Sequence, residues 1–239
     1  MNALKITLAA DNPVSLPLAY NYMVQGALYA DWKEFWPHLH DTGYMDGDHH
    51  FRLFTFGPLT GNSSVKDKTI TFRNLIHLEV RSPVAELIEK LADALIERGT
   101  MRIGRYDLPV VSLEAADALL FRSDATIEML SPVTVHETLS DGHTRYFAPT
   151  EDRFPLLLAQ NAASKLCAAG LPYPSHFGCG LISGTLKKCV TRFKGVYVTG
   201  YTGRFRLETD SRSMAFLYYT GLGTRNSQGF GMFSMRANP

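Results

Sequence analysis

KTITFRNLIHLEVRSPVAELIEKLADALIERG, residues 68–99, is a strand pattern that runs directly into a helix pattern. Apolar residues alternate along the first part and share one face of a strand, and only Asn74 breaks the alternation: Ile70, Phe72, Ile76, Leu78 and Val80. Apolar residues then recur at spacings of three and four from Val84 to Leu95, which is typical of an amphipathic helix, and Gly99 is expected to end it.

The same kinds of pattern continue on both sides of this segment. In the first half we predict further strands or helices at 3–10 (strand), 17–36 (helix), 51–57 (strand) and within 101–113 (strand). In the second half we predict 125–136 (strand), 154–169 (helix), 181–193 and 196–207 (strands), 211–219 (helix) and a strand from 230. Each half therefore has the order βαββαβ, and we predict an α+β protein with two tandem ferredoxin-like (RRM-like) domains, residues 1–118 and 119–239.

Composition narrows the class of protein. The chain has 239 residues, of which 45% are hydrophobic, as is usual for globular proteins. No apolar run approaches the ~20 residues of a membrane span, and the start, MNALKITLAADNP, does not have the pattern of a signal peptide. We therefore expect a cytoplasmic protein without a membrane partner, and three cysteines without a CxxC pair fit reduced thiols.

The basic residues are unevenly distributed. The net charge is only +1, but residues 1–119 carry 11 Lys/Arg and 15 Asp/Glu, whereas residues 120–239 carry 13 and 8. The segment from Lys187 onward contains nine basic residues and two acidic ones. A charge run is usually a solvated face. Because this one ends in a glycine-rich segment, we interpret it as a surface for a polyanion, with Lys187, Lys188 and Arg192 as binding residues.

The glycine-rich segment is GLGTRNSQGFGMF, residues 221–233. It is not a dinucleotide fingerprint, because too few residues follow it, and it lacks the Gly-Lys-Ser/Thr of a P-loop. A structural turn is the alternative. Glycine permits positive φ and close approach of a ligand, and successive N–H groups can bind an anion. We predict that the segment binds a polyanion through Gly221, Gly223, Arg225, Asn226, Ser227, Gly229 and Gly231.

A second cluster suggests proton-transfer chemistry. Six residues of suitable type lie within 24 positions: Tyr29, His38, His40, His49, His50 and Arg52. Histidine is the usual proton-transfer group near neutral pH, although a single histidine is more often structural. These histidines and Asp41 match metal-ligand spacing only loosely, and His176 with Cys179 has no second close pair. We therefore expect no metal and no other cofactor.

Both segments resemble one family. GLGTRNSQGFGMF is similar to the C-terminal glycine-rich signature of the CRISPR-associated endoribonucleases that cut repeat RNA, members of the RAMP superfamily. LHDTGYMDGDHHFRLFTF, residues 39–56, resembles the family's catalytic segment. The resemblance places the catalytic histidine on His40, the catalytic tyrosine on Tyr29 and the family's lysine on Arg52.

Two departures accompany this resemblance. Arginine can stabilise a phosphorane charge but cannot give up a proton at useful pH. Residues 45–50 are an insertion relative to the family segment, and they make His49 and His50 further candidates for contact with the substrate.

The resemblance implies a metal-independent endoribonuclease that cleaves CRISPR repeat RNA in precursor guide RNA. The 2′-OH would attack, leaving a 2′,3′-cyclic phosphate and a 5′-OH, with His40 and Tyr29 sharing the two proton transfers in an order that the sequence leaves open. A non-catalytic RAMP subunit that binds guide RNA is the main alternative, and an unrelated RNA-binding protein is the second. Association with other effector subunits, or as a homodimer, also stays open.

Overall fold

The computed structural model describes residues 1–33, 35–36, 43–116 and 119–236. The first half of the chain builds a six-stranded antiparallel sheet in the order β4-β6-β1-β8-β7, and β5 also pairs with β6. Its strands are β1 (Ala3–Pro17), β4 (Thr55–Phe56), β5 (Thr60–Lys66), β6 (Thr69–Arg81), β7 (Thr100–Ile103) and β8 (Tyr106–Ala115). The central order β8-β1-β6 with β4 and β5 outside is that of a ferredoxin-like domain.

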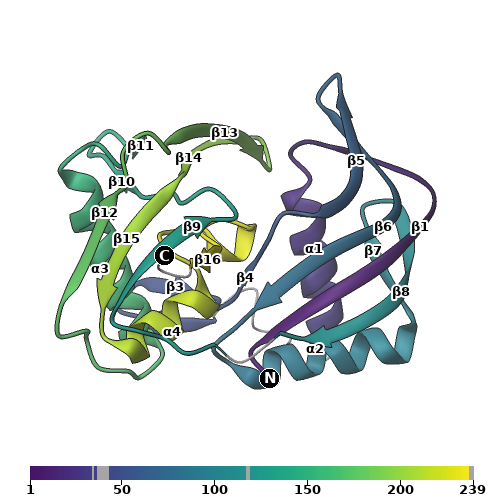
Figure 1. Ribbon diagram of the computed structural model, residues 1–239, viewed down its shortest axis with the longest axis horizontal. Helices are drawn as coiled ribbons and strands as arrows, with labels where there is room; N and C mark the ends of the chain where they lie inside the picture. The colour runs from purple at the N-terminus through teal and green to yellow at the C-terminus, as the bar shows by residue number, and fades with distance from the viewer. Residues whose placement is uncertain (34, 37–42, 117–118, 237–239) are drawn as a thin grey trace.

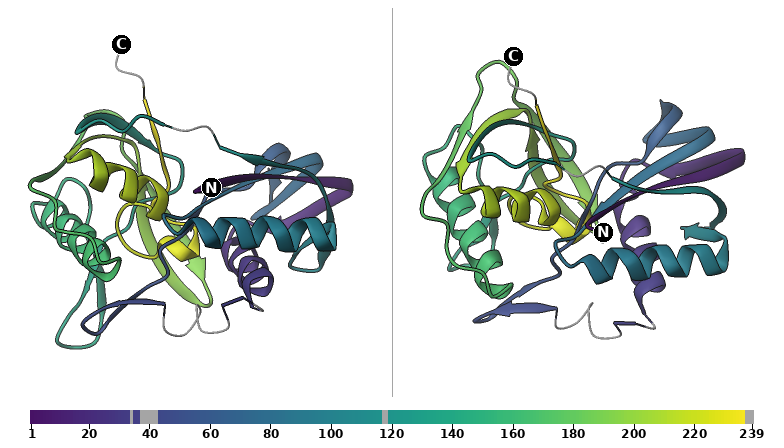
Figure 2. Two further views of the ribbon diagram at one scale, coloured as in Figure 1. Left: turned by 90° about the horizontal axis from the view of Figure 1, so that it is seen from below. Right: turned by 60° about the horizontal axis from the view of Figure 1, so that its bottom comes forward.

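Two helices cover one side of this sheet, as Figure 2 shows: α1 (Asn21–Trp32) and α2 (Ala85–Arg98). The alternation that predicted β6 is real, since Phe72, Ile76, Leu78 and Val80 are buried in the first core. Gly99 ends α2 in the left-handed conformation, with φ 68°. The Trp32 indole donates a 2.8 Å hydrogen bond to the carbonyl of Leu87 and ties α1 to α2.

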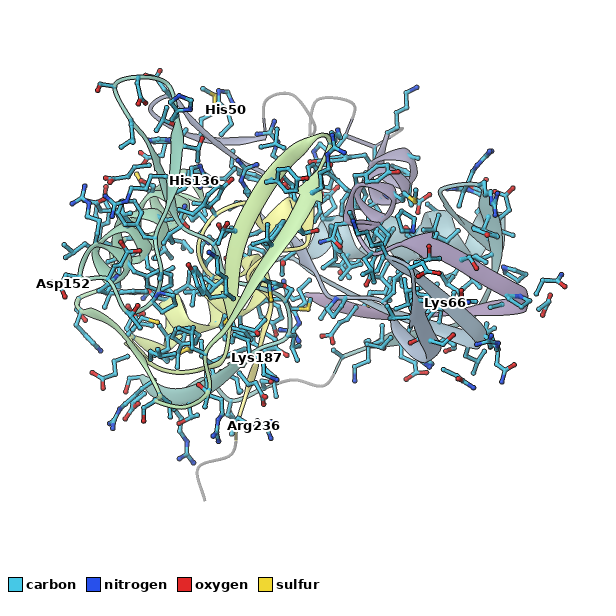
Figure 3. The ribbon with its side chains drawn as sticks, turned by 90° about the horizontal axis from the view of Figure 1, so that it is seen from above. His50, Lys66, His136, Asp152, Lys187 and Arg236 are labelled. Carbon is cyan, nitrogen blue, oxygen red and sulfur yellow. The ribbon has the colours of Figure 1, made fainter. Side chains whose placement is uncertain are left out.

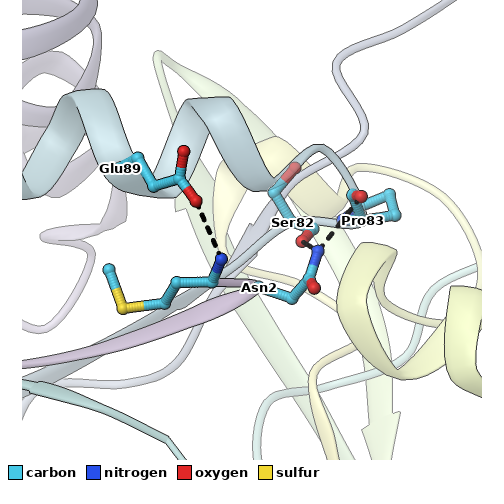
Figure 4. Close-up of polar contacts among 5 residues, drawn as sticks. Asn2, Ser82, Pro83 and Glu89 are labelled. Carbon is cyan, nitrogen blue, oxygen red and sulfur yellow. Dashed lines mark hydrogen bonds and ion pairs between the residues drawn. The ribbon is translucent and has the colours of Figure 1, made fainter.

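The start of β1 is held at the junction of β6 and α2 (Figure 4). The Asn2 amide donates hydrogen bonds of 3.0 and 3.1 Å to the carbonyls of Ser82 and Pro83. The N-terminal ammonium contacts Glu89 of α2 at 2.9 Å. These contacts fix β1, a central strand of the sheet, relative to α2, the helix that follows β6.

The second half repeats the topology (Figure 1). Its four-stranded sheet has the order β12-β15-β9-β16, with β9 (Asp124–Met129), β12 (Phe177–Leu181), β15 (Arg204–Thr209) and β16 (Phe233–Met235). Helices α3 (Arg153–Ala168) and α4 (Ser211–Thr220) share a core with it. Asp210 begins α4 by accepting a 2.9 Å hydrogen bond from the Ser213 amide. The two tandem ferredoxin-like domains predicted from the sequence are confirmed.

Several element boundaries were wrong. Pro17 ends β1 and does not start a helix, so α1 is shorter than predicted. The two long strands predicted over 181–207 are four, because the chain makes a separate hairpin of β13 (Lys187–Phe193) and β14 (Val196–Thr202). A smaller hairpin, β10 (His136–Thr138) with β11 (Thr144–Tyr146), follows β9. These insertions alternate like sheet strands, so periodicity did not separate them from the sheet.

One segment of the first half packs on the second. The hairpin β2 (Tyr44–Asp46) with β3 (His49–Phe51) lies against α3, as Figure 2 also shows. Leu53 is buried in the second core, whereas Phe54 is buried in the first. The chain therefore crosses between the two cores at this point. The predicted domain boundary, after residue 118, falls at residues 117–118, which lie outside the described ranges.

Arg81 joins the halves a second time. It is 2% exposed, donates a 2.7 Å hydrogen bond to the carbonyl of Phe233 and lies over the ring of Tyr218. Glu79 pairs with it at 2.7 Å. A buried guanidinium is retained only when its charge and donors are matched, so this contact fixes β6 against β16. None of the helices in the described part of the chain has the length and apolarity needed to cross a bilayer.

Candidate functional site

A groove of about 1190 Å³ lies between the two halves. Its walls come from α1, β3 and the residues after it, β10, α3, the tip of the β13–β14 hairpin and the glycine-rich segment. Of the residues predicted to act, the groove brings together Tyr29, Arg52, Gly223, Arg225, Asn226 and Ser227. His40, the predicted catalytic histidine, lies outside the described residues, as do His38 and Asp41.

Tyr29 lies on α1 with its ring half-buried. The ring meets Phe54 and Trp32 edge to face, with centroids 5.8 and 6.4 Å away. Its hydroxyl hydrogen-bonds Ser227 and Arg52. Burial raises the pKa of the tyrosine above its usual value of 10.0, while the charge of Arg52 and the two hydrogen bonds act in the opposite direction. Tyr29 therefore keeps its proton at neutral pH.

Helix α1 ends at Trp32, three residues after Tyr29. Tyr29 meets the glycine-rich segment from the far end of the chain.

Arg52 follows β3 and contacts Tyr29. One of its nitrogens also donates a 3.3 Å hydrogen bond to the carbonyl of His50. The next residue, Leu53, has a φ of 47°, which is uncommon for a residue with a side chain. The buried Ser82 hydroxyl holds the Leu53 carbonyl at 2.8 Å. This strained link turns the chain so that Arg52 faces the groove while Leu53 fills the second core.

The glycines of the glycine-rich segment have positive φ, as the sequence predicted: 88°, 71°, 82° and 77° for Gly221, Gly223, Gly229 and Gly231. Most of them pack against protein. A Cβ on Gly229 would come within 2.6 Å of the Phe56 ring, and one on Gly221 would lie 2.7 Å from the Asn226 amide nitrogen. Gly223 is the one of the four that lines the groove. That these glycines contact RNA stays a prediction.

The glycine-rich segment is tied directly to α1. Gln25 donates a 2.8 Å hydrogen bond to the carbonyl of Ser227, and Asn21 donates one of 3.0 Å to the carbonyl of Gln228. Residues Asn226–Gln228 form a single 3₁₀ turn, η1. Arg225, directly before this turn, has the left-handed backbone conformation, with φ 61°. The Ser227 hydroxyl thereby reaches Tyr29.

Lys165 of α3 was not singled out from the sequence. It is 2% exposed and its ammonium donates three hydrogen bonds to the glycine-rich segment: 2.6 Å to the carbonyl of Gly221, 3.1 Å to that of Gly223 and 3.0 Å to Oδ1 of Asn226. Burial lowers the pKa of Lys165 from 10.5 to about 7. The available signal was its position among the buried residues Leu158, Ala162 and Leu166 of an amphipathic helix.

His136 was also missed, since it lies 84 residues from the nearest residue of the predicted site in the first half. Its Nδ1 lies 3.1 Å from the Thr224 hydroxyl, and burial and the charge of Arg225 lower its pKa below 6.5. A neutral imidazole in the groove can accept or donate a hydrogen bond. His49 and His50 also line the groove, and Figure 3 shows His50 and His136 toward the same end of the molecule.

The basic residues predicted to bind RNA are not all near this groove. Lys187, Lys188 and Arg192 lie on β13 and do not line it; Figure 3 shows Lys187 well apart from His50 and His136. Only the tip of that hairpin, Phe193 and Lys194, reaches the groove.

Some of the charge in the basic segment is neutralised by β9. Arg206 pairs with Asp124 at 2.6 Å and with Glu208 at 2.9 Å, and Arg236 pairs with Glu128. Of the other basic residues from Lys187 onward, four lie on the β13–β14 hairpin and Arg225 lines the groove, whereas Arg204 and Arg212 lie on β15 and α4.

Among the residues that the structure describes, no group of three His, Cys, Asp or Glu side chains is arranged to hold a metal ion. The groups available in the described part of the groove include the protonated hydroxyl of Tyr29, arginine and lysine side chains and the neutral imidazole of His136.

Comparison with known proteins identifies the family. Over its full length the fold is similar to a Cas6-related protein from Pyrococcus furiosus, with a TM-score of 0.84, 19% identity and coverage of 100% of this chain and 99% of the other. It is also similar to a structure described as a RAMP protein binding different RNA substrates, with a TM-score of 0.83, 20% identity and coverage of 99% and 100%.

In sequence, the chain is 25% identical over 240 residues to the CRISPR-associated endoribonuclease Cas6 1 of Methanocaldococcus jannaschii, covering 96% of this chain and 91% of that protein. The family model described as CRISPR associated protein Cas6, C-terminal, matches residues 115–235, more than half of the chain. That match includes α3, the basic hairpin and the whole glycine-rich segment that closes the groove, and the chain accordingly belongs to the Cas6 family of CRISPR-associated proteins.

Proposed function

We propose that this protein cleaves CRISPR repeat RNA within precursor transcripts and so produces guide RNA. The observation that carries the proposal is the contact of Tyr29 with both Arg52 and Ser227, in a groove whose walls come from both halves of the chain. The relative from Methanocaldococcus jannaschii, described as an endoribonuclease, supports this activity. RNA would cross the groove with one phosphate beside these three side chains.

The reaction is cleavage by the 2′-OH that precedes the scissile phosphate. RNA carries its own nucleophile, so the protein supplies a base for that hydroxyl, an acid for the leaving 5′-oxygen and a cation for the phosphorane. Arg52 supplies the cation. Because the raised pKa of Tyr29 keeps its hydroxyl protonated, Tyr29 donates its proton to the leaving 5′-oxygen, and His40 takes the proton of the 2′-OH.

The first test is a cleavage assay with the repeat RNA encoded beside the gene, in the presence of EDTA. We expect cleavage to persist, with a 2′,3′-cyclic phosphate and a 5′-OH at the cut. An otherwise identical substrate with 2′-deoxyribose at the nucleotide before the cut should bind and stay intact. Cleavage of this deoxy substrate would refute attack by the 2′-OH.

The second test concerns His40. His40→Ala should lower the single-turnover cleavage rate by at least ~100-fold, the usual cost of losing a general acid or base, with little change in RNA affinity. His176→Ala, a change at a histidine that does not line the groove, is the matched control. A near-normal rate for His40→Ala would move the assignment to another histidine, and a wild-type protein that binds repeat RNA without cutting it would be a non-catalytic RNA-binding subunit.

A further inference from the structure

The ammonium of Lys165 is surrounded by acceptors from one segment only. Its three hydrogen bonds go to Gly221, Gly223 and Asn226, which span six residues of the glycine-rich segment. No carboxylate in the described part of the chain forms an ion pair with it. A buried cation without a counter-ion is costly unless its donors are fully used, and here three acceptors match the three N–H bonds of an ammonium.

In the described part of the chain no loop or turn N–H donates to the carbonyls of Gly221 and Gly223, and the Gly221 carbonyl has one further donor, the Thr220 hydroxyl at 3.4 Å. Gly221 follows the last turn of α4, where carbonyl oxygens lack helical partners. Asn226 completes the arrangement, because its amide nitrogen donates to the carbonyls of Leu222 and Phe230, each at 3.1 Å, while its oxygen accepts from Lys165. Lys165 and Asn226 together therefore fold the segment into a closed loop.

The loop then transmits this geometry to the proposed active site. Asn226 precedes Ser227, whose carbonyl is held by Gln25 and whose hydroxyl contacts Tyr29. A chain of contacts therefore runs from α3 through Lys165, Asn226 and Ser227 to Tyr29. Each link is a hydrogen bond or a peptide bond.

We propose that Lys165 is a positioning residue of this ribonuclease: it clamps the glycine-rich loop so that Ser227 orients the Tyr29 hydroxyl toward the RNA phosphate. This inference rests on the proposed function for its catalytic consequence, but the clamp itself is a property of the folded protein. Misplacing a reacting group by about 1 Å can cost ~100-fold in rate. The clamp therefore acts on the rate of cleavage more than on RNA affinity.

Protonation of Lys165 adds a distinguishing property. The ammonium donates three hydrogen bonds, whereas the neutral amine donates two. Burial lowers the pKa of Lys165 to about 7, so the third bond is lost as the pH rises through neutrality. The groove is also lined by the titratable groups of Tyr29, Arg52, His136, Glu137, Lys194 and Arg225 and by the two histidines of β3, so the test compares variants at each pH.

The experiment measures single-turnover cleavage and RNA affinity for wild type, Lys165→Met and Lys165→Arg. Methionine keeps the length and apolar stem but removes the donors, and arginine keeps a charge at every pH. We expect Lys165→Met to lower the cleavage rate roughly 10- to 100-fold with a change in Kd of less than about 3-fold. Lys194→Met removes an exposed groove charge that does not contact the loop, and it should weaken affinity instead.

The pH profile separates positioning from simple packing. The ratio of wild-type to Lys165→Met rates should be largest near pH 6 and should shrink above pH 8, where the wild-type amine is neutral. For Lys165→Arg the alkaline decrease attributed to Lys165 should disappear. A ratio that stays constant across this range, or a Lys165→Met protein that cleaves at the wild-type rate, would overturn the proposal.

Hydrogen exchange tests the clamp without any cleavage. The amides of Leu222, Thr224 and Gly231 are bonded to the carbonyls of Gly231, Thr134 and Pro132. Peptides covering 221–231 should exchange faster in Lys165→Met than in wild type, while peptides from α2 stay unchanged. Unchanged exchange in the loop would refute the clamp. Absence of cleavage by the wild type would refute the proposed function and the positioning role, while leaving the exchange result as evidence on the clamp alone.

Discussion

Gln25 donates a 2.8 Å hydrogen bond from its Nε2 to the carbonyl oxygen of Ser227, which lies 202 residues later in the chain. Gln25 and Tyr29 are four residues apart on α1 and so project from the same side of the helix. Helix α1 therefore holds the Ser227 backbone through Gln25 and meets the Ser227 hydroxyl through Tyr29. Two neighbouring side chains of one helix face thus bind the same loop residue.

Gln25→Leu should loosen the loop without changing the helix. Gln25 is 7% exposed, and leucine would leave the Ser227 carbonyl without this donor, at a cost of about 1–3 kcal/mol. We expect a roughly 10-fold lower single-turnover cleavage rate. Asn62→Leu, at an exposed position of β5, is the control. An unchanged rate for Gln25→Leu would show that the loop holds its position without α1.

Tyr29→Phe removes one hydroxyl and keeps the ring contacts with Phe54 and Trp32. We expect cleavage to fall by at least ~10-fold while the melting temperature changes little, because the lost group acts as a proton donor in our proposal. Tyr22→Phe, at a tyrosine that is 38% exposed on the same helix, should behave like wild type. Wild-type cleavage by Tyr29→Phe would exclude the hydroxyl from the reaction.

The sequence predicted the architecture better than the site. The apolar alternation of β6 and the 3–4 spacing of α2 were sufficient because burial on one face imposes those periods. Tyr29 and Arg52 were found through a family resemblance, and the groove unites them with the glycine-rich segment. His136 carries no local pattern that marks it, and Lys165 carries only its place on the buried face of α3. The role of each becomes visible only through partners more than 50 residues away.

The glycines illustrate a different limit. Positive φ was predictable, because glycine alone adopts it freely. What the glycines face was not, because the Phe56 ring and the Asn21 amide that surround Gly229 come from the other half of the chain. Likewise, the pairing of Arg206 and Arg236 with carboxylates of β9 is invisible in a count of charges along the sequence.

Gly229→Val should first destabilise the fold. Its φ of 82° disfavours a branched side chain, and a Cβ would lie 2.6 Å from the Phe56 ring. We expect a loss of a few kcal/mol in the free energy of unfolding, measured by thermal and chemical denaturation. Gly26→Ala, where a Cβ meets nothing within 4 Å, should not destabilise the protein. If Gly229→Val melts normally but binds RNA poorly, the glycine serves ligand contact and not packing.

RNA binding should depend on salt through the β13–β14 hairpin. Reversing the charges of Lys187, Lys188 and Arg192 should flatten the plot of log Kd against log salt, by about 0.7–0.9 for each RNA phosphate that the variant no longer neutralises. Arg206→Gln is the matched control, because its guanidinium is already paired with Asp124 and Glu208. An unchanged slope in the triple variant would identify the hairpin as a solvated face.

Lys165 should also make stability depend on pH. Its pKa is about 7 in the folded protein and 10.5 in the unfolded reference, so the unfolded chain binds more protons between these values. The contribution of Lys165 to the free energy of unfolding therefore rises with pH above 7, by at most about 1.4 kcal/mol per pH unit, and is flat below 7. Denaturant unfolding of wild type and Lys165→Met at pH 6, 7, 8 and 9 measures this difference. A constant difference would mean that the lysine does not titrate in this range.

The bond between Gln25 and Ser227 also has a consequence for the timing of synthesis. A ribosome adding 5–20 residues per second needs about 10–40 s to make the 202 residues that separate the two partners. For most of that interval α1 and Arg52 have already been made, while the loop that meets them has not. A nascent chain is therefore unable to assemble the groove around RNA, including its own messenger, until translation has passed the glycine-rich segment.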